Sequence, residues 1–243
     1  MKPTILATLT LAAGLASASA ASIYLGDTRN AGTPPSGVTN PSDQGGVDGW
    51  NSNMIIQNGQ SYTVNSADIS GGNALVATEF NFMVGNNRGR VTPFIVEVLS
   101  QTSFNVLAIG DTRISGVDYN ANGIQNVAFS AGGAFDLSGL VSDGMVIAAG
   151  FINSDPDGTN TVGSVIPFTN NSVPAGEQWY NGNSAVDTYP AGVLTDGSFS
   201  ADSAANVTVR AYDFNVGLDV IPEPSTGLLG LVGLGLLAAR RRR

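Results

Sequence analysis

Apolar and polar residues alternate with a period of two in several stretches of the chain, the pattern of strands that bury one face. The stretches 76–84 and 207–218 alternate in this way. Three further runs, at 91–99, 104–109 and 145–151, are apolar at successive positions, which suits central strands covered on both faces or strands between a sheet and a large loop. These patterns predict β-strands through most of the chain.

Residues that favour turns separate these runs. The segment 85–89 (GNNRG) stands between two predicted strands and predicts a hairpin loop, while 120–123 and 154–158 predict further turns. No amphipathic helix is evident between the two ends of the chain. About ten strands without helices predict an all-β fold: a single antiparallel β-sandwich of jelly-roll type over residues 21–219.

Residues 1–20 have the layout of a secretory signal peptide. Lys2 supplies the positive charge, residues 5–15 form an apolar stretch, and Ala18 and Ala20 form an A-x-A cleavage site. A signal peptidase would cut after Ala20, although the preceding A-x-A at 16–18 offers a second register. The less favoured alternative is a buried N-terminal helix.

The segment 220–243 joins three further elements. Pro222, Glu223 and Pro224 should end the preceding strand, because proline has no N–H to donate. The apolar segment 225–239 would form a helix about 23 Å long at ~1.5 Å per residue, which is shorter than the ~30 Å core of a bilayer. The chain ends in four residues that should hold it on the cytoplasmic side: Arg240, Arg241, Arg242 and Arg243. We therefore expect a translocated domain attached to a short transmembrane helix.

These three elements resemble the PEP-CTERM sorting signal of Gram-negative bacteria. The resemblance implies a partner, an exosortase-type membrane transpeptidase with a cysteine nucleophile that cuts near the PEP tripeptide. Pro222, Glu223 and Pro224 would then be a recognition element without catalytic duty. The resemblance also implies transient insertion in the inner membrane, followed by delivery to the cell surface or the extracellular space. It is confined to this signal, and a permanent membrane anchor is the alternative.

Composition excludes several kinds of chemistry. The 243 residues include no cysteine and no histidine, so disulfides, thiolate nucleophiles, Ser-His-Asp triads and zinc sites built on these residues are ruled out. Between the leader and the terminal arginines, five arginines stand against 19 acidic residues, a net charge of −14. Nucleic acids and anionic lipid surfaces would repel such a chain, whereas cations would be attracted.

Few carboxylates are placed for glycoside hydrolysis, which needs two of them at a defined separation. The translocated part contains only four glutamates: Glu79, Glu97, Glu177 and Glu223. Glu79 and Glu97 flank the predicted hairpin and could be cross-strand neighbours. A solvated strand face is the simpler explanation for both.

Asp155, Asp157 and Asn160 place oxygen atoms around Gly158 in the manner of a calcium loop. The segment lacks the length and the final bidentate glutamate of an EF-hand, so we favour an ordinary turn. No cofactor is expected, and calcium is the ion that the sequence would favour if a metal bound.

Aromatic residues in surroundings rich in Gly and Asn suggest a sugar-binding surface. Trp50, Trp179, Tyr180 and Tyr189 lie in segments that look like loops. Sandwich modules use such side chains to stack on sugar rings. The alternative is that these aromatics anchor loops against the core.

The sequence therefore predicts an exported, non-enzymatic protein of the cell surface or extracellular matrix. A structural or adhesive role linked to exopolysaccharide follows from where the PEP-CTERM resemblance points. The alternative is a carbohydrate-binding module that uses loop aromatics. A third candidate is a glycoside hydrolase that depends on Asp and Glu.

Overall fold

The computed structural model describes residues 22–26, 54–84, 89–100, 103–119, 123–157, 159, 166, 168–169, 179–181, 198–200, 207–208, 211–212 and 214–222. Within these ranges no helix has the length and apolar character needed to cross a membrane. The predicted signal peptide (1–20) and the apolar segment 225–239 lie outside them.

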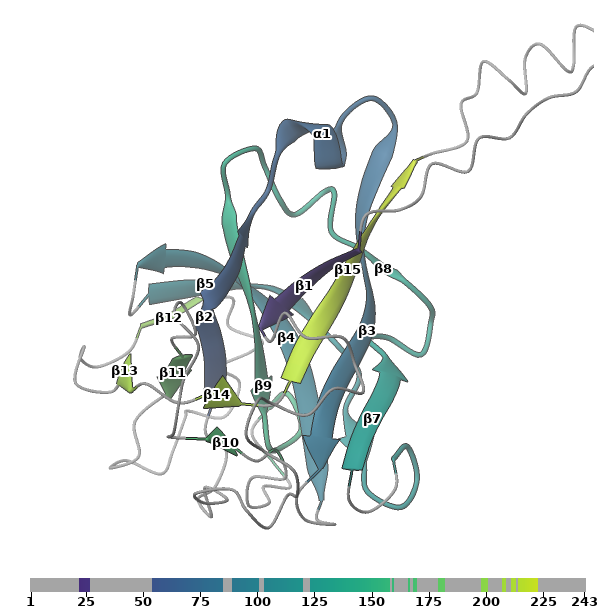
Figure 1. Ribbon diagram of the computed structural model, residues 1–243, viewed down its shortest axis with the longest axis vertical. Helices are drawn as coiled ribbons and strands as arrows, with labels where there is room; N and C mark the ends of the chain where they lie inside the picture. Colours follow the sequence, from purple (N-terminus) through teal and green to yellow (C-terminus); the bar gives the residue numbers. More distant parts are fainter. Residues whose placement is uncertain are drawn as a thin grey trace, which may run out of the picture.

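The described part is built almost wholly of antiparallel strands (Figure 1). Sheet 1 has the order β1 (Ser22–Gly26), β15 (Phe214–Pro222), β3 (Asn73–Val84), β7 (Gly123–Ala128), with β8 (Phe135–Asp136) also paired to β3. Sheet 2 has the order β12 (Ser198–Ser200), β5 (Ser103–Ile109), β4 (Arg90–Ser100), β9 (Val146–Ile152), β2 (Met54–Thr63), β11 (Trp179–Asn181), β13 (Val207–Thr208), with β6 (Arg113–Ile114) on β4. The remaining elements are the pair β10 (Phe168–Thr169) and β14 (Ala211–Tyr212), and the one-turn helix α1 (Ser66–Ile69). The predicted all-β class is confirmed.

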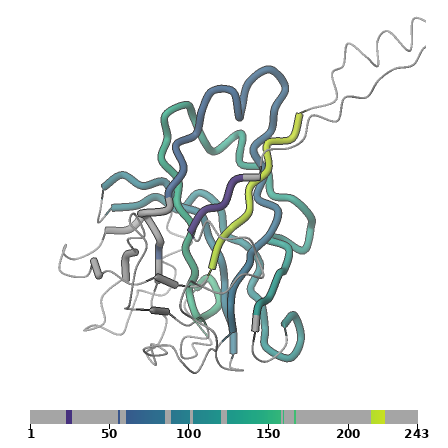
Figure 2. The backbone as a smooth tube through the Cα atoms, viewed as in Figure 1, coloured from purple at the N-terminus to yellow at the C-terminus, as the bar shows by residue number. Residues whose placement is uncertain are grey.

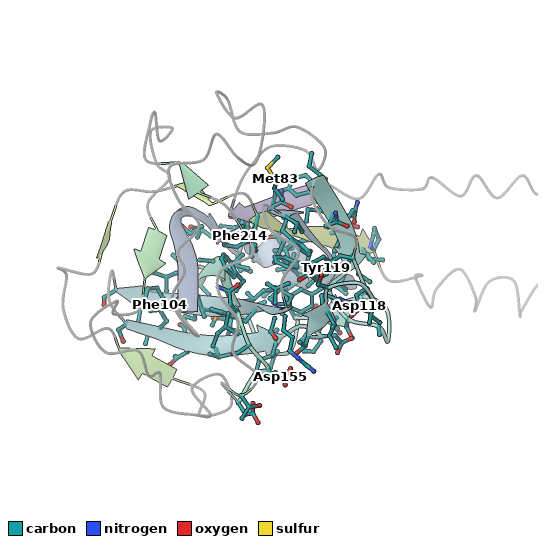
Figure 3. The ribbon with its side chains drawn as sticks, turned by 90° about the horizontal axis from the view of Figure 1, so that it is seen from below. Met83, Phe104, Asp118, Tyr119, Asp155 and Phe214 are labelled. Carbon is teal, nitrogen blue, oxygen red and sulfur yellow. The ribbon has the colours of Figure 1, made fainter. Side chains whose placement is uncertain are left out.

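The two sheets share one apolar core. Phe80, Phe82 and Phe214 of sheet 1 are at most 2 % exposed, and they belong to the same cluster as Ile95 and Phe151 of sheet 2. The rings of Phe151 and Phe214 meet edge to face, with their centroids 4.9 Å apart. Side chains fill the space around Phe214 and Tyr119 in the view from below (Figure 3). Face-to-face packing of two sheets is the arrangement of a β-sandwich.

Sheet 2 also buries a second apolar cluster. Its members are at most 1 % exposed: Ile56, Phe94, Val96, Phe104, Ala148 and Ile152. Along β4, members of this cluster alternate with members of the main core. Residues 91–96 of β4 and 147–152 of β9 are therefore buried on both faces, as the apolar runs predict, whereas Leu99 at the end of β4 is 53 % exposed and β5 is only partly buried.

Two strand predictions were wrong. The stretches 76–84 and 91–99 were expected to form a hairpin, yet β3 belongs to sheet 1 and β4 to sheet 2, so the segment between them crosses from one sheet to the other. The tip of that segment, residues 85–88, lies outside the described residues. Turn residues suit a crossover between sheets as well as a hairpin, and β4 pairs with β5 instead.

The stretch 207–218 was expected to be one continuous strand. It contributes instead to three strands: β13 joins sheet 2, β14 pairs with β10, and β15 joins sheet 1. Period-two alternation continues through these breaks, so the local pattern alone did not reveal them. The core positions Phe214, Val216 and Leu218 nevertheless lie on one face, as the alternation predicts.

Candidate processing and ligand-binding sites

Strand β15 carries the chain out of the sandwich and into the PEP tripeptide. Phe214–Leu218 are buried, Asp219 and Val220 are half-buried, and Ile221 is 41 % exposed. Pro222 is the last residue of the strand, opposite Asn73 of β3, which confirms that this proline ends the strand. The strand thus continues three residues beyond position 219 and ends on the first proline of the tripeptide.

The first described strand lies beside the last one. β1 pairs with β15 in antiparallel register, from Gly26 opposite Asn215 to Ser22 opposite Asp219. Figure 2 shows the first described segment, in purple, running alongside the last, in yellow. Both ends of the described chain therefore leave sheet 1 at the same end. The other predicted processing residues lie outside the described part: Ala18, Ala20, Glu223, Pro224, Arg240, Arg241, Arg242 and Arg243.

The predicted calcium loop is organised by contacts within the protein. Arg90 Nη1 donates a hydrogen bond to Asp155 Oδ1 at 2.8 Å and forms an ion pair with it. Asp157 Oδ1 accepts hydrogen bonds from the N–H and the hydroxyl of Thr159, at 2.9 and 2.6 Å. These bonds from Thr159 lower the pKa of Asp157 below its ordinary value. This geometry is that of a tight turn held by carboxylates.

No described group of three Asp, Glu, His or Cys side chains is placed to hold a metal ion. Asn160, the third residue of the predicted calcium set, lies outside the described residues. Asp155 lies at the rim of the sandwich (Figure 3).

Glu79 and Glu97 are not cross-strand neighbours, because β3 and β4 belong to different sheets. Glu79 Oε1 accepts a hydrogen bond from Asn81 Nδ2 at 2.9 Å. Glu97 Oε2 accepts one from Asn105 Nδ2 at 2.8 Å. Each carboxylate therefore contacts an amide of its own sheet, and the suggested pairing of the two is wrong.

A buried amide cluster on sheet 1 was not anticipated from the sequence. Asn81 Nδ2 also donates to Asn215 Oδ1 at 2.9 Å, and both asparagines are at most 4 % exposed. The Glu79 side chain lies over Gly217, where an added Cβ would come within 2.7 Å of Glu79 Cγ. Alternation along 76–84 places Glu79 and Asn81 on one face, where they contact each other, but it does not show that Asn215 and Gly217 of β15 lie beside them. The cluster cross-links the strand that leads to the PEP tripeptide with its neighbour β3.

Two of the candidate aromatics lie in a strand instead of a loop. Trp179 and Tyr180 begin β11, where Trp179 is opposite Thr208 and Tyr180 is opposite Ile56. The Gly- and Asn-rich surroundings had suggested a loop, but pairing with β2 and β13 overrides that local preference. Trp50 and Tyr189 lie outside the described residues.

Tyr119 makes the stability of the domain depend on pH. Burial raises its pKa to about 12, its hydroxyl donates to the Gly89 carbonyl at 3.1 Å, and its ring meets Phe82 edge to face. The unfolded chain should ionise Tyr119 from about pH 10, whereas the folded chain resists until about pH 12. The free energy of unfolding is therefore unaffected by Tyr119 below about pH 10, and it decreases as the pH rises from about 10 to about 12.

At pH 11 we expect the ionisation of Tyr119 alone to lower the free energy of unfolding by about 1 kcal/mol relative to pH 8. Urea unfolding at the two pH values measures the loss, and Tyr119→Phe should show a smaller one. Some dependence should remain, because burial also raises the pKa of Tyr24 and Tyr62. An unchanged pH dependence in the variant would contradict the assignment to Tyr119.

Comparison with known proteins bears on one end of the chain. Residues 220–243 match the family model of the PEP-CTERM protein-sorting motif. No curated protein and no solved structure matches the chain. The matched range begins at Val220, within β15, so the motif and the closing strand of sheet 1 overlap. The C-terminal end of this chain is a PEP-CTERM protein-sorting motif, which indicates an exported protein that is sorted by a membrane-bound exosortase.

Proposed function

We propose that the mature protein is a non-enzymatic structural or adhesive component of the cell surface or extracellular matrix, associated with exopolysaccharide. The sorting motif at residues 220–243 carries the proposal. Because Pro222 is itself the last residue of a central strand, the signal is joined to the sandwich without a linker. The sandwich is then the cargo that the exosortase delivers.

We infer a jelly roll from the strand order of this cargo. Sheet 1 has the order β1-β15-β3-β7, and the main part of sheet 2 has the order β2-β9-β4-β5. The chain changes sheet between β1 and β2, between β2 and β3, and between β3 and β4. Two four-stranded sheets linked by such crossovers form the double Greek key of a jelly roll.

The acidic side chains of the described part support a structural role. Nine of them accept hydrogen bonds that hold turns and strand neighbours in place: Asp68, Glu79, Glu97, Asp111, Asp118, Asp136, Asp143, Asp155 and Asp157. Asp68, for example, accepts from the Asn65 N–H and from the Tyr62 hydroxyl, both at 2.8 Å. Carboxylates used in this way stabilise a scaffold, which is consistent with a structural role.

Intact mass and C-terminal peptide mapping of the protein from its native host, after fractionation, test this proposal. We expect a species that begins near Ala21, ends near the PEP tripeptide and co-fractionates with exopolysaccharide outside the inner membrane. A species that keeps residues 228–243 in the membrane fraction would contradict exosortase processing. Turnover by the purified domain on a panel of polysaccharides would contradict the non-enzymatic role and favour the glycoside hydrolase.

A carbohydrate-binding module is the second candidate, favoured by the position of Trp179 and Tyr180 in a strand of sheet 2. A strand holds its backbone more rigidly than a loop does, which suits a stacking platform. Affinity electrophoresis in gels that contain polysaccharide should show retardation, and Trp179→Ala or Trp50→Ala should abolish it. Leu99→Ala is the matched control, because Leu99 is an apolar residue 53 % exposed on β4 of the same sheet. Equal loss in the control would argue against a specific aromatic contact.

A further inference from the structure

Polar side chains gather on the face of sheet 1 that points away from the core. The phenylalanines of β3 and β15 face the core, so the residues that alternate with them take the opposite face, here called the outer face. On this face Asn81 of β3 is opposite Asn215 of β15. Glu79 is opposite Gly217, which is opposite Tyr24 of β1. Three neighbouring strands, β1, β15 and β3 (Figure 1), therefore bring together a carboxylate, two amides and a phenol.

The Glu79 carboxylate is held in place by its surroundings. Asn81 Nδ2 donates hydrogen bonds to Glu79 Oε1 and to Asn215 Oδ1, both at 2.9 Å. The Glu79 side chain lies over Gly217, where an added Cβ would come within 2.7 Å of Glu79 Cγ. The register of β15 on β3 shifts between Gly217 and Leu218, and such bulges re-aim side chains, often beside functional sites. Two asparagines, a glycine and a bulge thus together fix one carboxylate on the outer face.

This arrangement costs stability that a simple solvated sheet face would not lose. Asn81 is 2 % exposed and Asn215 is 4 % exposed, so two amides have been taken out of water. Within the described part of the chain, Asn81 Oδ1 is buried and accepts no hydrogen bond. Buried polar groups are nearly always paired, so an exception calls for an explanation. A ligand that donates hydrogen bonds to this face is such an explanation, because Asn81 Oδ1 and the neighbouring carboxylate are both acceptors.

A second carboxylate of the outer face comes from Asp219. Burial raises the pKa of Tyr24 above its ordinary value, and the charges of Glu79 and Asp219 raise it further, so both carboxylates lie near the Tyr24 phenol. All three side chains are partly exposed. In the part of the chain that the structure describes, no arginine or lysine forms an ion pair with Glu79. An aromatic ring beside two carboxylates attracts an ammonium group, through the face of the ring and through charge-assisted hydrogen bonds.

We propose that the outer face of sheet 1 binds a polysaccharide that carries free amino groups, such as a de-N-acetylated hexosamine polymer. The ammonium group donates to Glu79 and Asp219, while the apolar face of the sugar ring packs against Tyr24. The two carboxylates and the net charge of −14 repel uronic acids. This inference rests on the proposed association with exopolysaccharide, and it names the class of sugar. The surface is separate from Trp179 and Tyr180, which lie in sheet 2.

Two oligosaccharides with the same backbone test the proposal: the hexamer of glucosamine, which is cationic at mildly acidic pH, and the neutral hexamer of N-acetylglucosamine. Isothermal titration calorimetry at low salt measures their binding to the protein recovered from its native host. We expect the wild-type protein to bind the glucosamine hexamer more tightly. Glu79→Gln keeps the shape of the side chain and removes its charge, so it should weaken this binding about tenfold. Asp219→Asn is the second variant and should weaken it as well.

Glu97→Gln is the matched control. Glu97 also accepts a hydrogen bond from an asparagine, Asn105 Nδ2 at 2.8 Å, but it belongs to sheet 2. Its replacement removes the same charge from the protein and should change the affinity by less than about twofold. Far-UV circular dichroism of each variant is the control for folding.

Each outcome decides something different. Equal weakening by Glu79→Gln and Glu97→Gln would show only a general attraction between an acidic protein and a cationic oligomer, and would overturn the site. Equal affinity of the wild-type protein for the two hexamers would overturn the role of the amino group. Absence of binding to either hexamer would overturn the inference, whereas co-fractionation of the protein with exopolysaccharide would still support the proposed function. Binding of the glucosamine hexamer by a protein that does not co-fractionate with exopolysaccharide would defeat the proposed function alone.

Discussion

Replacing Phe214 with alanine should lower the free energy of unfolding of the exported domain by about 3–5 kcal/mol. Phe214 is 1 % exposed on β15, and its ring lies 4.9 Å from that of Phe151 in sheet 2 and 6.3 Å from that of Phe80 in sheet 1. Removing the ring leaves a cavity where the two sheets meet. Since whole domains are stable by only about 5–15 kcal/mol, the loss is a large share of the total. Urea unfolding of purified residues 21–222 measures it.

Ile221→Ala is the matched control for this prediction. Ile221 is an apolar residue on the same strand, but it is 41 % exposed. We expect its replacement to change the free energy of unfolding by no more than about 0.5 kcal/mol. Equal effects of the two substitutions would contradict the packing of β15 against sheet 2.

A chain that ends at residue 213 should fail to fold at all. It lacks β15, which lies between β1 and β3 and buries Phe214, Val216 and Leu218 in the core. Burial of each such side chain contributes about 1.5–3 kcal/mol, so the loss of three reaches the stability of a whole domain. Far-UV circular dichroism and the absence of a cooperative urea transition would show the effect.

A chain that ends at Asp219 is the control. It tests whether removing other C-terminal residues has the same effect as removing β15. It lacks only Val220, Ile221 and Pro222, which are half-buried or exposed. We expect a cooperative transition with stability reduced by about 1–2 kcal/mol relative to the chain that ends at Pro222. A cooperative transition in the chain that ends at residue 213 would contradict the central place of β15. We therefore expect sorting to cut after the core residues of this strand.

Local pattern was sufficient for much of the fold. Alternation identified β3 and the buried face of β15, and unbroken apolar runs identified β4, β5 and β9 as strands. The absence of N–H on proline predicted where β15 ends. The sorting motif was visible from three neighbouring elements at the C-terminal end, and the family model matches the same residues. All of these signals lie within a short stretch of sequence.

Partner choice was not visible in the sequence, because a period of two fixes which face a residue takes and says nothing about which strand lies beside it. The sequence alone therefore could not show that β3 and β4 belong to different sheets, nor that Asn81 reaches Asn215, 134 positions away. Gly110 is a similar case: an added Cβ would come within 2.7 Å of the Phe129 carbonyl oxygen, a contact made only once the sheets have assembled. The pairing of Ser22 with Asp219, which joins the first described strand to the last, is likewise a long-range contact that no local pattern reveals. The sequence by itself determined most of the strands, the buried face of β15 and the sorting signal, whereas the tertiary structure decided where strands break and which strands meet.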